Sequence, residues 1–499
     1  MDNTIKQRLI IYSIVSGISF VYLILVPFVG IGMPLYAIIQ LVLILYLSKD
    51  RVEVKNKKAL LLFIPIFMLT LRYFISGSYT FHLANFAVIF LLYSTMVLLF
   101  MDDLCIESQG LLFIKKILCT VFKPLLYFNI PIKWSIESNK ENPNRILFKR
   151  ILIGVIISIP CLVVITFLLM AADMVFESKI DVLFNSFGNF ISPITVFKIV
   201  FGILVGLYLF GLFYIIFEKK KESKEENNLE APKTIEKIIL KPQGDVVIIN
   251  VILISILTIY TMFAMIQFKY LFAAAFTNIS LPAGLTYAEY ARRGFFELLF
   301  LSFINIGLIL IIIYLTRDKI YNNTNKSGKF IKALMLYLCS ITVLLLISSF
   351  YRMVLYNNEY GFTELRLLVS IFLIFEALGL LITFYYIVKP KFNIVAFYSV
   401  ICLVFYLTIN MINLDSMIAK KNINMYYEGK DLDVYYLYTL SSDAAPQMKR
   451  LLNNDDSDIK QIAIDYFERL KMNSYDSKDW QSFNISRERA LKIKSQLDK

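Results

Sequence analysis

Val246 to Gln267 read VVIINVILISILTIYTMFAMIQ, a stretch without a charged side chain. A helix that crosses the roughly 30 Å hydrocarbon core of a bilayer needs about 20 residues of this kind. The stretch does not alternate with the period of two that marks the strands of a membrane barrel. Because lipid offers no partner to a backbone N–H or C=O group, such a segment has to be helical. The stretch therefore predicts a transmembrane helix.

Similar stretches recur along the 499-residue chain, which is 58% hydrophobic and only 18% charged. A soluble domain carries about a quarter of charged residues. We therefore predict an all-α integral membrane protein with about eleven transmembrane helices and a small helical extracytoplasmic C-terminal region. The predicted spans are 9–27, 32–48, 59–76, 82–100, 150–171, 196–217, 246–267, 296–315, 331–350, 365–387 and 394–412.

Lys and Arg collect in every second connection between these spans. One set of connections holds 27 Lys and Arg, and the alternate set holds 5. Because cationic loops remain in the cytoplasm, we predict a cytoplasmic N-terminus, an extracytoplasmic C-terminus and a cell-membrane location. The same rule accounts for the net charge of +13, so we expect no nucleic-acid partner. The cationic set comprises 1–8, 49–58, 101–149, 218–245, 316–330 and 388–393.

Composition divides the chain into four predicted parts. The first membrane half, 1–217, holds six spans, and the second, 246–412, holds five. A charged cytoplasmic linker, 218–245, separates the halves, and residues 413–499 form an extracytoplasmic helical tail. Within the first half, the segment 101–149 carries apolar residues at helical spacing. This segment either lies on the inner leaflet or packs against the helix bundle.

Helix-capping residues mark the predicted helices of the tail. Ser441 or Ser442 can cap one helix, with Pro446 in its first turns. Asp456 or Asp458 can start a second helix, and a third follows Asn484 or Ser486.

A carboxylate in the middle of a predicted span is the best pointer to function. Glu376 lies eleven residues into the span 365–387. A charge at this depth costs about 2.5–3.5 kcal/mol on insertion scales. Glu376 therefore needs a partner, a proton or water.

Further charged residues gather where spans begin or end on the predicted outer side. Glu289, Arg293 and Glu297 follow at intervals of four, so they share one helical face. The remaining candidates are Asp173, Arg352, Glu364 and Arg366. Two readings stay open for these residues: an outward-facing polar site, or an ion-pair network that fixes the outer loops to the bundle.

Motifs of soluble enzymes and of metal sites are missing from the sequence. The five cysteines follow no ligand spacing, and His82 is the only histidine. No nucleotide-binding loop, zinc-protease motif or nucleophile elbow occurs. We therefore expect no cofactor, no metal and no enzymatic activity. Gly202 and Gly206 form a GxxxG motif, which favours close helix packing.

Two outer segments and the tail carry a family resemblance. The segments are GLTYAEYARRGFFEL (284–298) and YRMVLYNNEYGFTELRL (351–367), and the tail begins NLDSMIAKKNINMYYEGKDLDVYYLYTLSSDAAPQM (413–448). With Ala172–Phe176 and Asp479–Asn484, they resemble the bacterial membrane family called domain of unknown function 4173, which is close to the one numbered 4153. Leu414 departs from the proline that this resemblance leads us to expect. The resemblance implies a multi-pass membrane protein and supplies no catalytic residue.

Three functions are compatible with these patterns. The first is a carrier or lipid-handling protein of the bacterial envelope, with an outward-facing polar site and membrane lipids as partners. The second is a membrane sensor or scaffold that binds a protein partner through residues 413–499. The third, an intramembrane transferase that uses Glu289, Glu297 or Glu364 as acid or base, has no motif in its favour.

Overall fold

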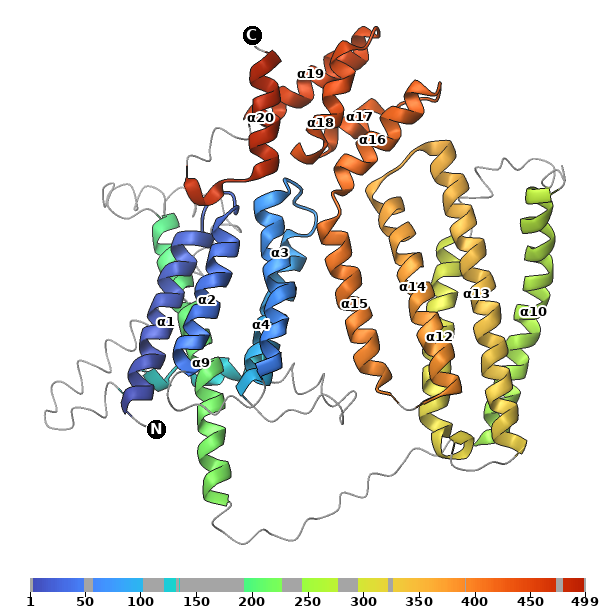
Figure 1. Ribbon diagram of the computed structural model, residues 1–499, viewed down its shortest axis with the longest axis horizontal. Coiled ribbons are helices and arrows are strands. Elements are labelled where there is room, and N and C mark those ends of the chain that lie inside the picture. Colours follow the sequence, from blue (N-terminus) through green and yellow to red (C-terminus); the bar gives the residue numbers. More distant parts are fainter. Residues whose placement is uncertain are drawn as a thin grey trace, which may run out of the picture. The chain divides into compact units, whose positions relative to one another are not determined.

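The described part of the chain is built from helices alone. The computed structural model describes residues 3–48, 57–101, 121–131, 134, 193–226, 245–276, 295–321, 326–390, 392–472 and 479–497 (Figure 1). Within these ranges, nine helical segments are long and apolar enough to cross a membrane. The all-α multi-pass architecture is confirmed. The predicted span 150–171 lies outside the described residues.

The bounds of these helices follow the apolar blocks of the sequence. A shorter helix, α2, covers Gly32–Ser48. The long helices are α1 (Asn3–Ile24), η1 with α3 (Lys57–Leu62 and Phe63–Ile75), α4 (His82–Met101), α9 (Pro193–Glu226), α10 (Val246–Phe276), α12 (Phe295–Tyr321), α13 (Lys326–Tyr360), α14 (Glu364–Val388) and α15 (Ile394–Met411).

The outer surfaces of the spans are apolar. Leu83 is 87% exposed, Val247 69% and Ile18 65%. Soluble proteins rarely expose contiguous apolar surface on this scale. These surfaces are therefore suited to contact with the acyl chains of lipids.

The structure divides into two compact units. The first comprises Met1–Lys233 and Glu468–Lys499, and the second comprises Thr234–Phe467. The chain passes from the first unit to the second within the charged segment 218–245.

In the first unit, α1 lies along both α2 and α9 (Figure 1). Glycines allow the α1–α9 contact: a Cβ atom on Gly17 would lie 2.6 Å from the carbonyl oxygen of Gly202. One on Gly206 would lie 2.7 Å from the carbonyl oxygen of Ser13, whose hydroxyl donates to the Gly206 carbonyl at 2.8 Å. The predicted packing role of the GxxxG motif is confirmed.

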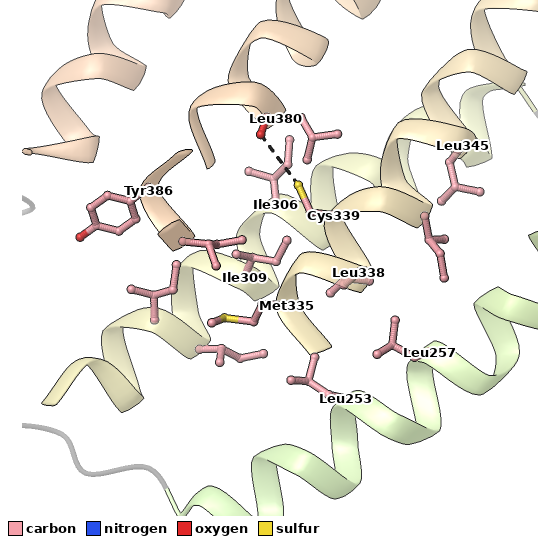
Figure 2. Close-up of a cluster of buried hydrophobic side chains, with 14 of the residues drawn as sticks. Leu253, Leu257, Ile306, Ile309, Met335, Leu338, Cys339, Leu345, Leu380 and Tyr386 are labelled. Carbon is pink, nitrogen blue, oxygen red and sulfur yellow. Dashed lines mark hydrogen bonds between the residues drawn. The ribbon is translucent and has the colours of Figure 1, made fainter. Parts of the chain in front are cut away.

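In the second unit, α12 to α15 follow one another as antiparallel hairpins. Their connections span only 322–325, 361–363 and 389–393. Side chains of α10, α12, α13 and α14 build the core between them (Figure 2). Leu253, Ile309, Met335 and Leu380 are among its most buried members.

The described residues of the tail, 413–472 and 479–497, form short helices. The second unit holds α16 (Leu414–Tyr427), α17 (Val434–Thr439), η4 (Ser442–Ala444), α18 (Ala445–Met448), η5 (Lys449–Asn453) and most of α19 (Ser457–Met472). The first unit holds the end of α19, η6 (Trp480–Ser482) and α20 (Ile485–Leu497).

The predicted caps of these tail helices are observed. The side chains of Ser441, Asp456 and Asn484 each accept a backbone N–H at the start of η4, α19 and α20. Asn413 caps α16 by accepting the Ser416 N–H at 3.1 Å. Leu414 takes the first helical position there, where proline is also favoured, so the departure from the resemblance leaves the turn intact.

Part of the segment 101–149 is described, and it contacts the bundle. The helix η3 (Lys123–Tyr127) packs on α9. Tyr208 of α9 donates its hydroxyl to the Val121 carbonyl at 2.9 Å. Of the six apolar residues predicted to form an amphipathic helix, Val121, Phe122 and Leu125 are described, and Leu111, Ile114 and Leu118 lie outside the described residues.

Candidate functional site

Glu376 is buried in the middle of α14 and faces α12. Its side chain is 6% exposed. The Ser302 hydroxyl donates to one carboxylate oxygen, Oε1, at 2.6 Å. The other oxygen, Oε2, is buried and has no hydrogen-bond partner among the described residues. A buried carboxylate oxygen without a hydrogen-bond donor destabilises the folded protein, and such atoms are rare in native structures.

Uncharged polar residues continue this site along α12 and α13. Asn305 lies three residues after Ser302, on the same face of α12. Its side chain accepts from the Tyr260 hydroxyl at 2.9 Å and donates to the Thr342 hydroxyl at 3.1 Å. The chain of hydrogen bonds therefore joins α10, α12 and α13 inside the apolar core.

Polar residues also follow Glu376 along α14. Tyr398 of α15 donates its hydroxyl to the Gly379 carbonyl at 2.8 Å and lies 2.5 Å from the hydroxyl of Thr383. Together these residues form a polar seam within the second unit, which comprises Tyr260, Ser302, Asn305, Thr342, Glu376, Thr383 and Tyr398.

Arg366, at the start of α14, holds the turn that joins α13 to α14. Its guanidinium donates to the carbonyl oxygens of Tyr360 and Gly361 at 3.1 and 2.7 Å. It also lies over the ring of Tyr356, 4.1 Å from the centroid. A cation at the last carbonyls of a helix is favourable because these groups carry partial negative charge. Arg366 therefore serves as a cap for α13.

Residues of the tail bind the same turn between α13 and α14. Asn422 of α16 accepts the Phe362 N–H at 2.6 Å and donates to the Phe362 carbonyl at 2.8 Å. Gly361 has φ +76°, a left-handed conformation that glycine adopts without strain. Lys430 donates to the Asn358 carbonyl.

Tyr436 of α17 binds the first turn of α14. Its hydroxyl accepts the Glu364 N–H at 2.9 Å. Burial raises the pKa of Tyr436, so the phenol stays neutral.

Those predicted site residues that the structure describes lie at two levels of the second unit. Glu376 follows Glu364 by twelve positions on α14, which is about 18 Å along a helix axis at 1.5 Å per residue. Arg352 is 6% exposed on α13, Glu364 is half-buried and Glu297 is exposed in the first turn of α12. Glu289, Arg293 and Asp173 lie outside the described residues.

Sequence reasoning missed Ser302, the hydrogen-bond donor to Glu376, and the other uncharged residues of the polar seam. Ser302, Asn305 and Thr342 are uncharged, and single polar residues are common in spans. The sequence marks them in one way only: Ser302 and Asn305 are polar residues, three positions apart, within an otherwise apolar segment. Among the described residues, no group of three or more His, Cys, Asp or Glu side chains could hold a metal ion.

A protein family described as a domain of unknown function (DUF4153) matches residues 63–451. The match includes both outer segments and the first part of the tail, and it agrees with the resemblance drawn from those motifs. No curated protein and no solved structure matches the chain.

Proposed function

Because the chain belongs to the DUF4153 family, whose description names no activity, we propose from its own residues that it is a carrier of the cell membrane in which Glu376 binds and releases a proton. The observation that carries this proposal is the buried Oε2 atom of Glu376, which has no partner among the described residues. A proton on Oε2 would remove the charge that the membrane interior disfavours. Ser302 would then hold Oε1 in either state of the carboxyl group.

Protonation of Glu376 would change the hydrogen bonds and the packing of the polar seam. In the low dielectric of a helix bundle, hydrogen-bonded polar groups fix the packing of the helices, whereas an unpaired polar atom costs free energy. Charged groups within spans often mark proton relays of transporters. A change in the charge of Glu376 would therefore alter the contact between α12 and α14.

The alternation of Lys and Arg supports an orientation for this carrier. With 27 cations in one set of connections and 5 in the other, the N-terminus lies in the cytoplasm and the C-terminus outside. The α13–α14 turn then faces outward. Since Arg366 acts as a helix cap there, the proposal centres on Glu376 and not on the outward-facing cluster.

Carbodiimide labelling tests the proton site. Dicyclohexylcarbodiimide is an apolar reagent that modifies protonated carboxyl groups within membranes. In membranes that hold the full chain, we expect mass spectrometry to find the adduct on Glu376 and to find more of it at lower pH. The exposed Glu297 is the internal control and should remain unlabelled. An adduct that is absent from Glu376 at every pH would contradict the proton site.

Vesicles with a trapped pH-sensitive dye test the carrier. After an external acid step, vesicles with the wild-type chain should acidify faster than vesicles with Glu376→Gln. The substitution keeps an oxygen for the Ser302 hydroxyl, so folding should be preserved, and equal elution in gel filtration would verify this. If wild-type vesicles acidify no faster than empty ones, the carrier proposal fails.

A second candidate function is a scaffold that binds a protein partner through residues 413–499. Two exposed aromatic side chains of the tail support it: Tyr435 is 78% exposed and Tyr427 54%. Exposed tyrosines of this kind are enriched at interfaces. A photoreactive residue at position 435 should crosslink one protein in cells, whereas the same residue at the exposed position 460 should not. Identical adducts from both positions would count against a partner at this surface.

A further inference from the structure

The exposed face of α1 carries a continuous apolar stripe. Its members recur at intervals of three or four residues, which places them on one side of the helix: Ile11, Ile14, Ile18 and Tyr22. Each is between 47% and 65% exposed. Because α1 is long and apolar enough to cross a membrane, this α1 stripe is suited to contact with acyl chains.

The α1 stripe leads onto an aromatic residue of the tail. Trp480 of η6 donates its indole N–H to the Tyr22 hydroxyl at 3.2 Å, and the two ring centroids lie 6.2 Å apart. Half of Trp480 remains exposed. Since Tyr22 lies two residues before the end of α1 at Ile24, Trp480 lies at the level where this apolar helix ends.

Phe483, three residues further on, is held at the same level. Its ring, 45% exposed, lies 6.0 Å from that of Phe74 on α3, measured between centroids. Its carbonyl accepts the Ile31 N–H at 3.0 Å. A Cβ atom on Gly30 would lie 2.4 Å from the Phe483 carbonyl oxygen, so this glycine lets the tail lie directly on the α1–α2 connection. Backbone contacts therefore fix both rings at the ends of the spans.

The chemistry of these residues matches the layer where hydrocarbon meets headgroups. Trp and Tyr are enriched there because each has an apolar ring and a group that forms hydrogen bonds. A soluble partner could cover Trp480, but it could not reach Ile18 or Ile14 within the hydrocarbon. A phospholipid can cover all three, because its acyl chain runs along the span while its glycerol and headgroup remain at the end.

We propose that Trp480 and Phe483 anchor the tail in the interfacial layer of the bilayer, with phospholipids as the partners that cover their exposed rings. In the orientation predicted from Lys and Arg, this layer belongs to the outer leaflet. The surface lies wholly within the first unit. It therefore does not rest on the proposed carrier function, whose Glu376 belongs to the second unit.

The fluorescence of Trp480 tests this position. The sequence holds two tryptophans, Trp134 and Trp480, so Trp134→Phe leaves Trp480 as the sole emitter. The full chain is reconstituted into nanodiscs of phosphatidylcholine and phosphatidylglycerol, with bromine placed on the acyl chains either near the glycerol or near the chain ends. We expect a larger loss of emission from bromine near the glycerol. Iodide in the water should quench less than it does in the chain unfolded by guanidinium.

Position 492 provides the matched control. The Lys492 side chain is 73% exposed, and it lies roughly 10 Å further along α20 than Ile485. In Figure 1, α20 leads away from the ends of α2 and α3. With phenylalanine at positions 134 and 480, Lys492→Trp should therefore be quenched by iodide and by neither brominated lipid.

Three results would overturn the proposal. Trp480 could respond as position 492 does, which would place its ring in water. Bromine near the chain ends could quench it more strongly, which would place it deeper than the interface. It could resist all three quenchers, which would show that protein covers it. If Trp134→Phe does not elute as the wild type does in gel filtration, the wild-type emission minus that of Trp480→Phe gives the same measurement.

Discussion

Replacement of Gly17 by leucine is expected to separate α1 from α9 and to destabilise the first unit by about 3 kcal/mol or more. Overpacking in a close-packed interior typically costs about 1–3 kcal/mol when side chains can shift. Here the new Cβ atom would meet the backbone oxygen of Gly202 at 2.6 Å, and backbone cannot turn aside as a side chain can. The two helices would have to move apart.

Such a movement would also break other contacts between these helices. The hydrogen bond from Ser13 to the Gly206 carbonyl would be lost. Tyr12 of α1 contacts the ring of Phe213 on α9 at a centroid distance of 4.8 Å, and this contact would loosen. Helix association in membranes depends on such close packing, because lipid gives helices no hydrophobic reason to associate.

Gly307 provides the matched control for this prediction. It also lies within a span, but a Cβ atom added there would meet nothing within 4 Å. Gly307→Leu should therefore melt at or above the wild-type temperature, since leucine also favours helix more than glycine does. Thermal melting of the detergent-solubilised variants measures the difference. Equal melting of Gly17→Leu and Gly307→Leu would show that the close α1–α9 approach does not stabilise the protein.

The span positions could be predicted because the apolar blocks have the length that the bilayer imposes. The ends of the helices could not. The helix α13 was predicted to end near residue 350 and continues to Tyr360, and α9 continues past 217 to Glu226. Hydropathy reports where the hydrocarbon core ends, whereas a helix continues as long as its residues favour it. Glu and Lys, which dominate 218–226, are good helix formers.

Glu376 could be found in the sequence, but its surroundings could not. A charged residue in the middle of an apolar block is visible without a structure. Its contact with Ser302 depends on how α12 and α14 are rotated, and no single sequence gives that rotation. In the same way, the role of Arg366 depends on the left-handed turn at Gly361, which brings two carbonyl oxygens to the guanidinium.

Asn484 is the residue of the tail whose replacement should have the largest effect. Its Nδ2 atom donates to the carbonyl oxygens of Tyr73 and Ser76 at 2.9 and 2.8 Å. Its Oδ1 atom accepts the Arg487 N–H at 3.1 Å and so caps α20. One side chain, 6% exposed, therefore ties the start of α20 to the end of α3 within the first unit.

Contacts around Asn484 depend on this attachment. The Ile31 N–H donates to the Phe483 carbonyl at 3.0 Å, which joins the α1–α2 connection to the same segment. The guanidinium of Arg487 lies over the ring of Phe28, 4.3 Å from the centroid. Burial lowers the pKa of Arg487, although an arginine remains charged at neutral pH. If α20 detached, these contacts would be lost together.

Asn484→Ala should therefore destabilise the attachment of α20 by about 3 kcal/mol, because it removes two hydrogen bonds to backbone carbonyl oxygens, each worth about 1 kcal/mol, and a helix cap worth about 1 kcal/mol. Asn413→Ala is the matched control, since Asn413 acts only as a cap, on Ser416, and its loss should cost about 1 kcal/mol.

Hydrogen exchange of the backbone amides of α20 measures the effect, with the amides of α16 as the readout for the control. Faster exchange in α20 by about two orders of magnitude corresponds to the expected loss. If Asn484→Ala and Asn413→Ala accelerate exchange in their own helices equally, Asn484 is a helix cap and not the clamp between α20 and α3.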